Sequence, residues 1–180
     1  MRARAALLVV PLLLAGCGGG DEQDAASSSS PSASAAPVWN PCDGLDVAGI
    51  EGALGARLTQ EAGSADAPRC TLLPAVEGGA VVDANYLVFP AGLDAAWKQM
   101  GAPDDGSVTE PEIPGADAAR MVADAGTEVL AVTGFVQDGE LVQVVNAADP
   151  APYDERAVTA AVRETMQQLS AHAQAGGGPS

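Results

Sequence analysis

The sequence predicts an α+β fold, with a mainly antiparallel β-sheet, helices packed on one face and one disulfide. Two observations predict it. The elements expected along the chain follow the order helix, strands, helix, strands, helix. Short turns rather than crossover helices join the strands, which favours antiparallel pairing. We expect this fold over residues 38–172, as a single domain.

Three segments have the apolar spacing of helices. The first is Leu45–Gly55, with Asp43 expected as its N-cap and Gly55 as the glycine that ends it. The second is Leu93–Met100, followed by Gly101. The third, Asp154–Ala171, has the clearest apolar face. The side chains expected on that face are those of Val158, Val162, Thr165, Met166 and Leu169.

Strands are expected at residues 57–61, 69–73, 81–89, 118–123, 127–136 and 140–146. The last two form the clearest hairpin, because Gln137-Asp138-Gly139 separates two β-rich runs and Asp-Gly favours the positive φ of a tight turn. Residues 104–114 contain prolines, which lack the N–H that a strand donates, so this segment is expected to be irregular. Residues 149–152 are expected to break the sheet.

The N-terminus predicts a signal peptide over residues 1–16. Arg2 and Arg4 precede an apolar run that is too short to span a bilayer. Leu14-Ala15-Gly16-Cys17 is similar to the lipobox of bacterial lipoproteins, in which the cysteine thiolate takes up a diacylglyceryl group. We therefore expect Cys17 to carry two acyl chains, which anchor a protein stably. A plain secretory signal with an incidental cysteine is the alternative.

Residues 18–37 contain no Leu, Ile, Val, Met or aromatic residue, so they cannot bury enough apolar area to fold. With Cys17 they form the expected lipidated, disordered tether. Residues 173–180 are expected to be a disordered tail.

The cysteines predict one disulfide. With Cys17 lipidated, Cys42 and Cys70 remain in an oxidising compartment and have only each other as partners. We expect a structural bond, because a redox or metal-binding pair needs closer spacing or histidine partners.

Charge and composition exclude several functions. The 180 residues contain 8 Lys plus Arg against 24 Asp plus Glu, a net charge of −16, which argues against a nucleic-acid partner. The single histidine, His172, is expected at the end of the last helix, which leaves no residue for a Ser-His-Asp, Cys-His or zinc site. No phosphate-binding glycine motif joins a strand to a helix. We therefore expect no catalytic residues, no metal and no cofactor.

Two further groups of residues are candidate sites. Asp104, Asp105, Glu110, Glu112 and Asp117 do not match a calcium-binding loop and are expected to be a solvated acidic loop. Trp39 and Trp97 are candidates for an exposed contact with a partner, with packing onto the sheet as the alternative.

Taken together, the lipobox, the Ser/Ala/Pro tether, the Asn40-Pro41-Cys42-Asp43 start, the Ala53-Leu54-Gly55 helix end and the second cysteine resemble a family of actinobacterial cell-envelope lipoproteins of unknown function. The resemblance implies a lipid-anchored protein on the extracytoplasmic face of the cell membrane and supplies no catalytic residues. We expect a non-catalytic lipoprotein that binds another envelope protein through its sheet or its acidic surface. A binding module for a small apolar or lipid ligand, held between the sheet and its helices, is the alternative.

Overall fold

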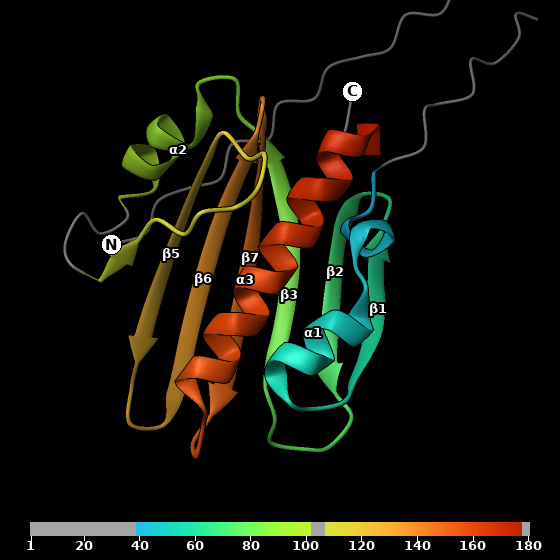
Figure 1. Cartoon of the computed structure of the whole chain (residues 1–180), viewed down its shortest axis with the longest axis vertical. Helices are drawn as coiled ribbons and strands as arrows, with labels where there is room; N and C mark the ends of the chain where they lie inside the picture. Colours follow the sequence, from blue (N-terminus) through green and yellow to red (C-terminus); the bar gives the residue numbers. More distant parts are fainter. Residues whose placement is uncertain (1–38, 102–106, 178–180) are drawn as a thin grey trace, which may run out of the picture. The chain divides into compact units, whose positions relative to one another are not determined.

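The structure, a computed structural model, describes residues 39–101 and 107–177 (Figure 1). The predicted signal peptide, the lipidation site Cys17 and the predicted tether lie outside the described residues, as do Asp104 and Asp105. None of the described helices combines the length and hydropathy that a membrane span needs.

Seven strands form one sheet in the order β1-β2-β3-β7-β6-β5-β4, and every neighbouring pair is antiparallel. The predicted antiparallel sheet is confirmed. The pairing of β3 with β7 joins the N-terminal and C-terminal strands at the centre of the sheet. The strands are β1 (Leu58–Ser64), β2 (Ala67–Pro74), β3 (Val81–Val88), β4 (Val108–Thr109), β5 (Ala118–Ala125), β6 (Val129–Asp138) and β7 (Leu141–Pro150).

Two helices cover one face of this sheet, which we call the inner face (Figure 1). They are α1 (Val47–Leu54), which follows the 3₁₀ turn η1 (Pro41–Gly44), and α3 (Glu155–His172). Alternate positions of the strands point towards them because successive side chains of a strand lie on opposite faces. The core beneath these helices contains fully buried side chains, among them Ile50, Leu72, Leu130, Val132, Val145, Val162, Met166 and Leu169.

Helix α3 lies especially close to the sheet at Gly134 of β6. A Cβ at this position would collide with Met166 Sδ and would lie 2.9 Å from Val162 Cγ1. The absence of a side chain at Gly134 therefore sets the distance between the helix and the sheet.

The other face, which we call the outer face, carries the short helix α2 (Gly92–Met100) at one end. Leu93 and Trp97 of α2 pack against Phe135, Val142 and Val144, which point away from the inner helices. The expectation of helices on one face thus describes the main layer of α1 and α3. A second, smaller apolar cluster forms where α2 lies on the opposite side.

The helix ends match the predicted signals with one exception. Gly55 and Gly101 take left-handed φ values of 73° and 64° and end α1 and α2. Asp43 was expected to cap α1, and this is wrong: Asp43 lies within η1, and the helix begins later. The cap is Asp46, whose carboxylate accepts a hydrogen bond from the Ala48 N–H at 3.1 Å.

The predicted hairpin is present with a shifted turn. The residues between the strands are Gly139 and Glu140, and Gly139 supplies the positive φ of 62°. Asp138 stays in β6, where it pairs with Leu141. The expected break at residues 149–152 also comes later, because β7 continues until Pro150 pairs with Val129.

The chain continues beyond His172 where the sequence predicts a disordered tail. A helical turn, η2 (Ala173–Gly177), extends α3. Gln174 Nε2 donates hydrogen bonds to Ser170 Oγ at 2.8 Å and to the Pro114 carbonyl at 3.2 Å. Polar contacts, which apolar periodicity does not reveal, hold this turn in place.

Candidate functional site

Cys42 of η1 and Cys70 of β2 form a disulfide, which confirms the predicted pairing. It closes a sequence separation of 28 residues and ties the start of the domain to the sheet. On the chain-entropy account a loop of this size stabilises a domain by roughly 3–4 kcal/mol.

Trp39 and Trp97 are both buried. The expectation of an exposed partner contact is therefore wrong for both, and both pack onto the sheet, as the alternative had it. Trp39 is 8% exposed and lies between Tyr86, edge-on with ring centroids 4.7 Å apart, and His172, stacked at 5.7 Å. Trp97 is 5% exposed and packs edge-on against Phe135 at 5.2 Å. Trp39 thus belongs to the main core and Trp97 to the smaller apolar cluster on the outer face.

The described residues contain no group of three or more His, Cys, Asp or Glu side chains placed to hold a metal ion. His172, the single histidine, stacks on Trp39 at the end of α3. Glu110, Glu112 and Asp117 line a surface hollow of about 400 Å³ beside β5. Arg120 crosses this hollow and forms ion pairs with Asp94 at 2.8 Å and Glu110 at 3.6 Å.

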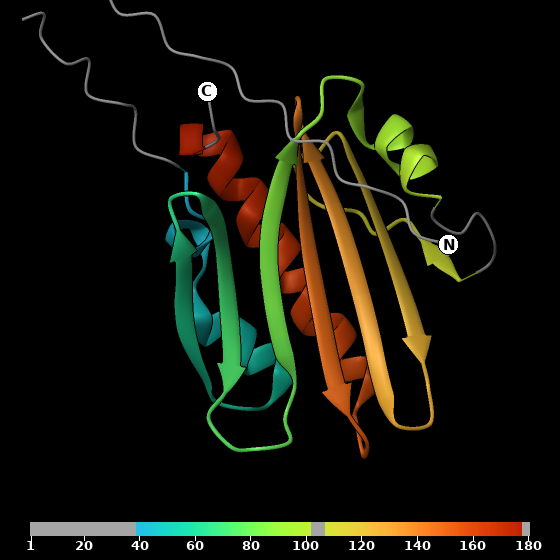
Figure 2. The ribbon, with the colours of Figure 1, turned by 180° about the vertical axis from the view of Figure 1, so that it is seen from behind.

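The outer face has a second part, which lies away from α2. It extends over β1, β2, β3 and the ends of β7 and β6 remote from α2. Seen from behind, no described helix covers this part of the sheet (Figure 2). The register places five polar side chains side by side across five strands. We call this set the polar row: Glu61, Thr71, Asp83, Asn146 and Thr133.

Hydrogen bonds between strands hold four of the five side chains of the polar row. Thr71 Oγ1 donates to Asp83 Oδ2 at 2.8 Å, and Thr133 Oγ1 donates to Asn146 Oδ1 at 3.1 Å. Asn85 donates to the other oxygen of Asp83 at 3.4 Å. The row therefore presents polar atoms whose positions are set before any partner binds.

The surface beside the polar row is composed of aliphatic side chains. Ala131, Ala148 and Val129 are exposed, whereas Leu73 and Val81 are half-buried. The alternation of residues 81–88 predicted two faces for β3. It did not reveal the polar row, because the row exists only in the register between strands.

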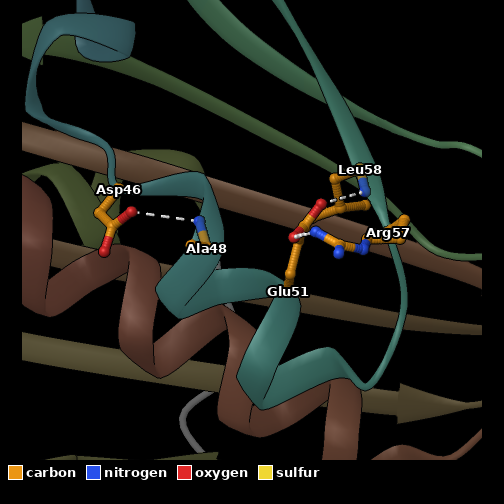
Figure 3. Close-up of polar contacts among 5 residues, drawn as sticks. All are labelled: Asp46, Ala48, Glu51, Arg57 and Leu58. Atoms are coloured by element: carbon orange, nitrogen blue, oxygen red, sulfur yellow. Dashed lines mark hydrogen bonds and ion pairs between the residues drawn. The ribbon is translucent and has the colours of Figure 1, made fainter.

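The edge of the sheet at β1 begins with a carboxylate contact (Figure 3). Glu51 of α1, whose side chain is 15% exposed, accepts a hydrogen bond from the Leu58 N–H at 2.8 Å and one from Arg57 Nη1 at 2.9 Å. The pKa of Glu51 lies below its ordinary value, mainly because the Leu58 amide donates a hydrogen bond to the carboxylate. The Arg57 guanidinium lowers this pKa further. Glu51 thus stays ionised and covers the first residue of the strand.

A second polar cluster, partly buried, lies where the β6–β7 hairpin meets the end of α3. Asp138 accepts hydrogen bonds from Ser170 Oγ at 2.7 Å, Gln143 Nε2 at 3.1 Å and Gln174 Nε2 at 3.2 Å. Burial nevertheless raises the pKa of Asp138 above its ordinary value. Gln143 is fully buried, and its Oε1 meets no donor among the described residues. This cluster joins three segments of the fold.

Comparison with known proteins adds little. No protein-family model matches the chain, and no curated protein matches it. A crystal structure of a GTP-binding regulator from Thermotoga maritima is similar at 10% sequence identity and a TM-score of 0.32, over 73% of this chain and 93% of that chain. Similarity at this level carries no argument about function.

Proposed function

We propose that this protein is a non-catalytic lipoprotein, anchored to the extracytoplasmic face of the cell membrane through Cys17, that binds another envelope protein through the outer face of its sheet. The observation that carries the proposal is the polar row on the part of the outer face that no described helix covers. The lipobox pattern supports the anchor, and the resemblance to envelope lipoproteins supports the location.

A surface whose side chains are already held suits a protein partner. Binding requires that side chains at the interface lose rotational freedom, and side chains that are already held lose less. Thr71, Asp83, Thr133 and Asn146 are held by hydrogen bonds across the strands, and the strands themselves are paired on both sides in β2, β3, β7 and β6. The surface is therefore organised before the partner arrives.

The charge of the chain favours a basic partner. The net charge is −16, and the outer face contributes Glu61, Asp83 and Asp124. Complementary charge speeds association and excludes partners of like charge. We therefore expect the partner surface to carry an excess of lysine and arginine.

The alternative, a small apolar ligand held between the sheet and its helices, gains no support. Leu130, Met166 and Leu169 fill that space and are fully buried. Three hollows along the described residues lie at the surface, and charged side chains contribute to the lining of each. They lie beside Tyr153 and Arg156, beside Glu110 and Arg120, and beside Glu51 and Arg57.

A photo-crosslinking side chain tests the binding face. It is placed at Ala148, on the outer face, or at Ala160, an exposed alanine of α3, in the full-length protein within the cells that make it. The proposal predicts a cross-link to one defined envelope protein from Ala148 and none from Ala160. Equal products from both positions, or none from Ala148, would overturn it.

The anchor is tested separately. Cys17→Ser removes the only sulfur that the lipobox positions for acylation. The proposal predicts that the intact protein from membranes has the mass of a diacylglyceryl form, and that the variant leaves the membrane fraction. An unmodified mass for the parent protein would contradict the anchor and leave the binding face to be judged by the cross-link.

A further inference from the structure

The exposed edge of β1 offers a second contact that the partner can use, and this inference rests on the proposed function. We infer that an extended, basic segment of the partner protein adds to the sheet as a new strand beside Gln60, Glu61 and Ala62. The partner would then touch both the polar row and the edge at which that row ends.

The two edges of the sheet are built differently. At one edge, β4 has only two residues, and Pro111 and Pro114 follow it. Short strands and prolines are the features by which sheets prevent further pairing. At the other edge, β1 has seven residues, contains no proline and carries Glu61 as its single charge. The fold protects one edge and leaves the other able to pair.

The ladder shows which backbone groups of β1 face outward. The Ala75 N–H donates to the Arg57 carbonyl at 2.9 Å, so the backbone groups of residue 57 point towards β2. Direction alternates along an antiparallel strand, which turns the N–H and C=O groups of residues 58, 60 and 62 away from the sheet. The hydrogen bond of Leu58 is consistent with this pattern, because its N–H points away from the sheet and donates to Glu51.

Gln60 and Ala62 are the open positions. Glu51 already occupies the Leu58 amide, and the ladder register shifts between Ala62 and Ser64. The open stretch is thus short and bounded at both ends, by a carboxylate on one side and by the shift of register on the other. Two outward-facing residues provide two N–H donors and two C=O acceptors for a bound strand.

A second copy of this chain is a poor occupant. When β1 of two copies pairs antiparallel so that Gln60 meets Ala62, Glu61 lies directly opposite Glu61. Like charges directly opposite destabilise a strand pair. Two neighbouring registers avoid this contact. One needs the Leu58 amide, which Glu51 holds, and the other needs Ser64, which lies beyond the shift of register. The edge therefore favours a foreign strand over self-association.

Glu61 sets the chemistry of the foreign strand. Its own backbone groups point towards β2, so the residue facing it on a new strand forms a non-hydrogen-bonded pair, in which side chains approach most closely. Glu61 is exposed and belongs to the polar row. A lysine or arginine of the partner at this position would pair with Glu61 and add a basic residue to the end of the row.

Four variants of the full-length protein that carries the Ala148 cross-linker test the inference. Gln60→Pro removes the outward N–H, and Gln60→Ala removes the same side chain but keeps that N–H. Glu61→Lys reverses the charge at the edge, and Glu77→Lys makes the same change in the exposed β2–β3 loop. Thermal unfolding of each variant verifies that the domain is folded.

The inference predicts that Gln60→Pro and Glu61→Lys each lower the yield of the Ala148 product by about tenfold, whereas Gln60→Ala and Glu77→Lys leave it within about twofold of the parent. Unchanged yields in Glu61→Lys and in a folded Gln60→Pro variant would overturn strand addition and leave the proposed function standing. Equal losses in Gln60→Pro and Gln60→Ala would also overturn it, because the side chain rather than the backbone would matter. The absence of any product in the parent would instead reject the proposed function.

Discussion

The inner and outer faces of the sheet are built from alternate residues of the same strands, yet they are covered differently. In β6, Leu130 and Val132 are fully buried beneath α3, whereas Ala131 between them is exposed. In β7, Val145 is fully buried and the next residue, Asn146, is exposed. Burial on one face stabilises the fold. The other face is free to vary in chemistry, which is where we place recognition of a partner.

The largest effect is expected from the inner face. Leu130→Ala should lower the free energy of unfolding by about 3 kcal/mol, because the lost methyl groups leave a cavity that the packed helix cannot fill. Val129→Ala, at a neighbouring residue that is 44% exposed, should cost less than about 1 kcal/mol. Denaturant unfolding of the folded domain measures both, and equal losses would contradict the division between the faces.

The contact between α3 and the sheet should tolerate no added side chain. Gly134→Ala should lower the free energy of unfolding by about 2 kcal/mol, because the new methyl group collides with Met166 and crowds Val162. Gly52→Ala is the matched control, since a Cβ there meets nothing within 4 Å and alanine favours a helix by about 1 kcal/mol. Thermal melts should therefore shift in opposite directions, and a neutral Gly134→Ala would show that α3 is not held closely.

A smaller effect depends on pH. Because burial raises the pKa of Asp138, the folded protein holds this proton at pH values where the unfolded chain has lost it. The stability that this group contributes is complete below the ordinary aspartate pKa, about 4, and is lost as the pH rises through the raised value.

Comparison with Asp138→Asn isolates the pH-dependent contribution of Asp138 to stability. The pKa of Asp149 is also raised by burial, but its contribution is the same in both proteins and cancels in the difference. The stability of the parent relative to the variant should fall as the pH rises from about 4 towards neutrality. Urea unfolding at several pH values measures this difference. A relative stability that rises with pH would show that the hydrogen bonds to Asp138 outweigh its burial.

The smallest effect on stability is expected on the outer face. Thr133→Ala removes the hydrogen bond to Asn146 and should change the free energy of unfolding by less than about 0.5 kcal/mol. The same change should lower the yield of the Ala148 cross-link, since Asn146 is then free to rotate. If stability falls markedly while the cross-link is unaffected, the polar row is structural and does not serve recognition.

Local patterns predicted much of the fold. The apolar spacing of residues 154–171 identified α3 and its buried face, and the sequence around Gly139 identified the β6–β7 hairpin. Gly55 and Gly101 marked the ends of two helices. Each of these features depends on residues that are close in the sequence, so local sequence patterns are sufficient to predict them.

Features that depend on distant residues were not predicted. The pairing of β3 with β7 joins residues separated by about a third of the chain, and the polar row depends on that register. The burial of Trp39 requires Tyr86 and His172, which arrive from β3 and from the end of α3. The cap of α1 was misplaced because Asp43 and Asp46 both suit a helix start, and only the η1 turn decides between them.

The most direct test of the central claim is the photo-crosslinking comparison between Ala148 and Ala160, because both residues are exposed alanines and differ in the face on which they lie. The outer-face account predicts one defined envelope protein cross-linked from Ala148 in the native membrane and no such product from Ala160. Capture of the same protein from Ala160 alone would contradict the account and move recognition to the helical face.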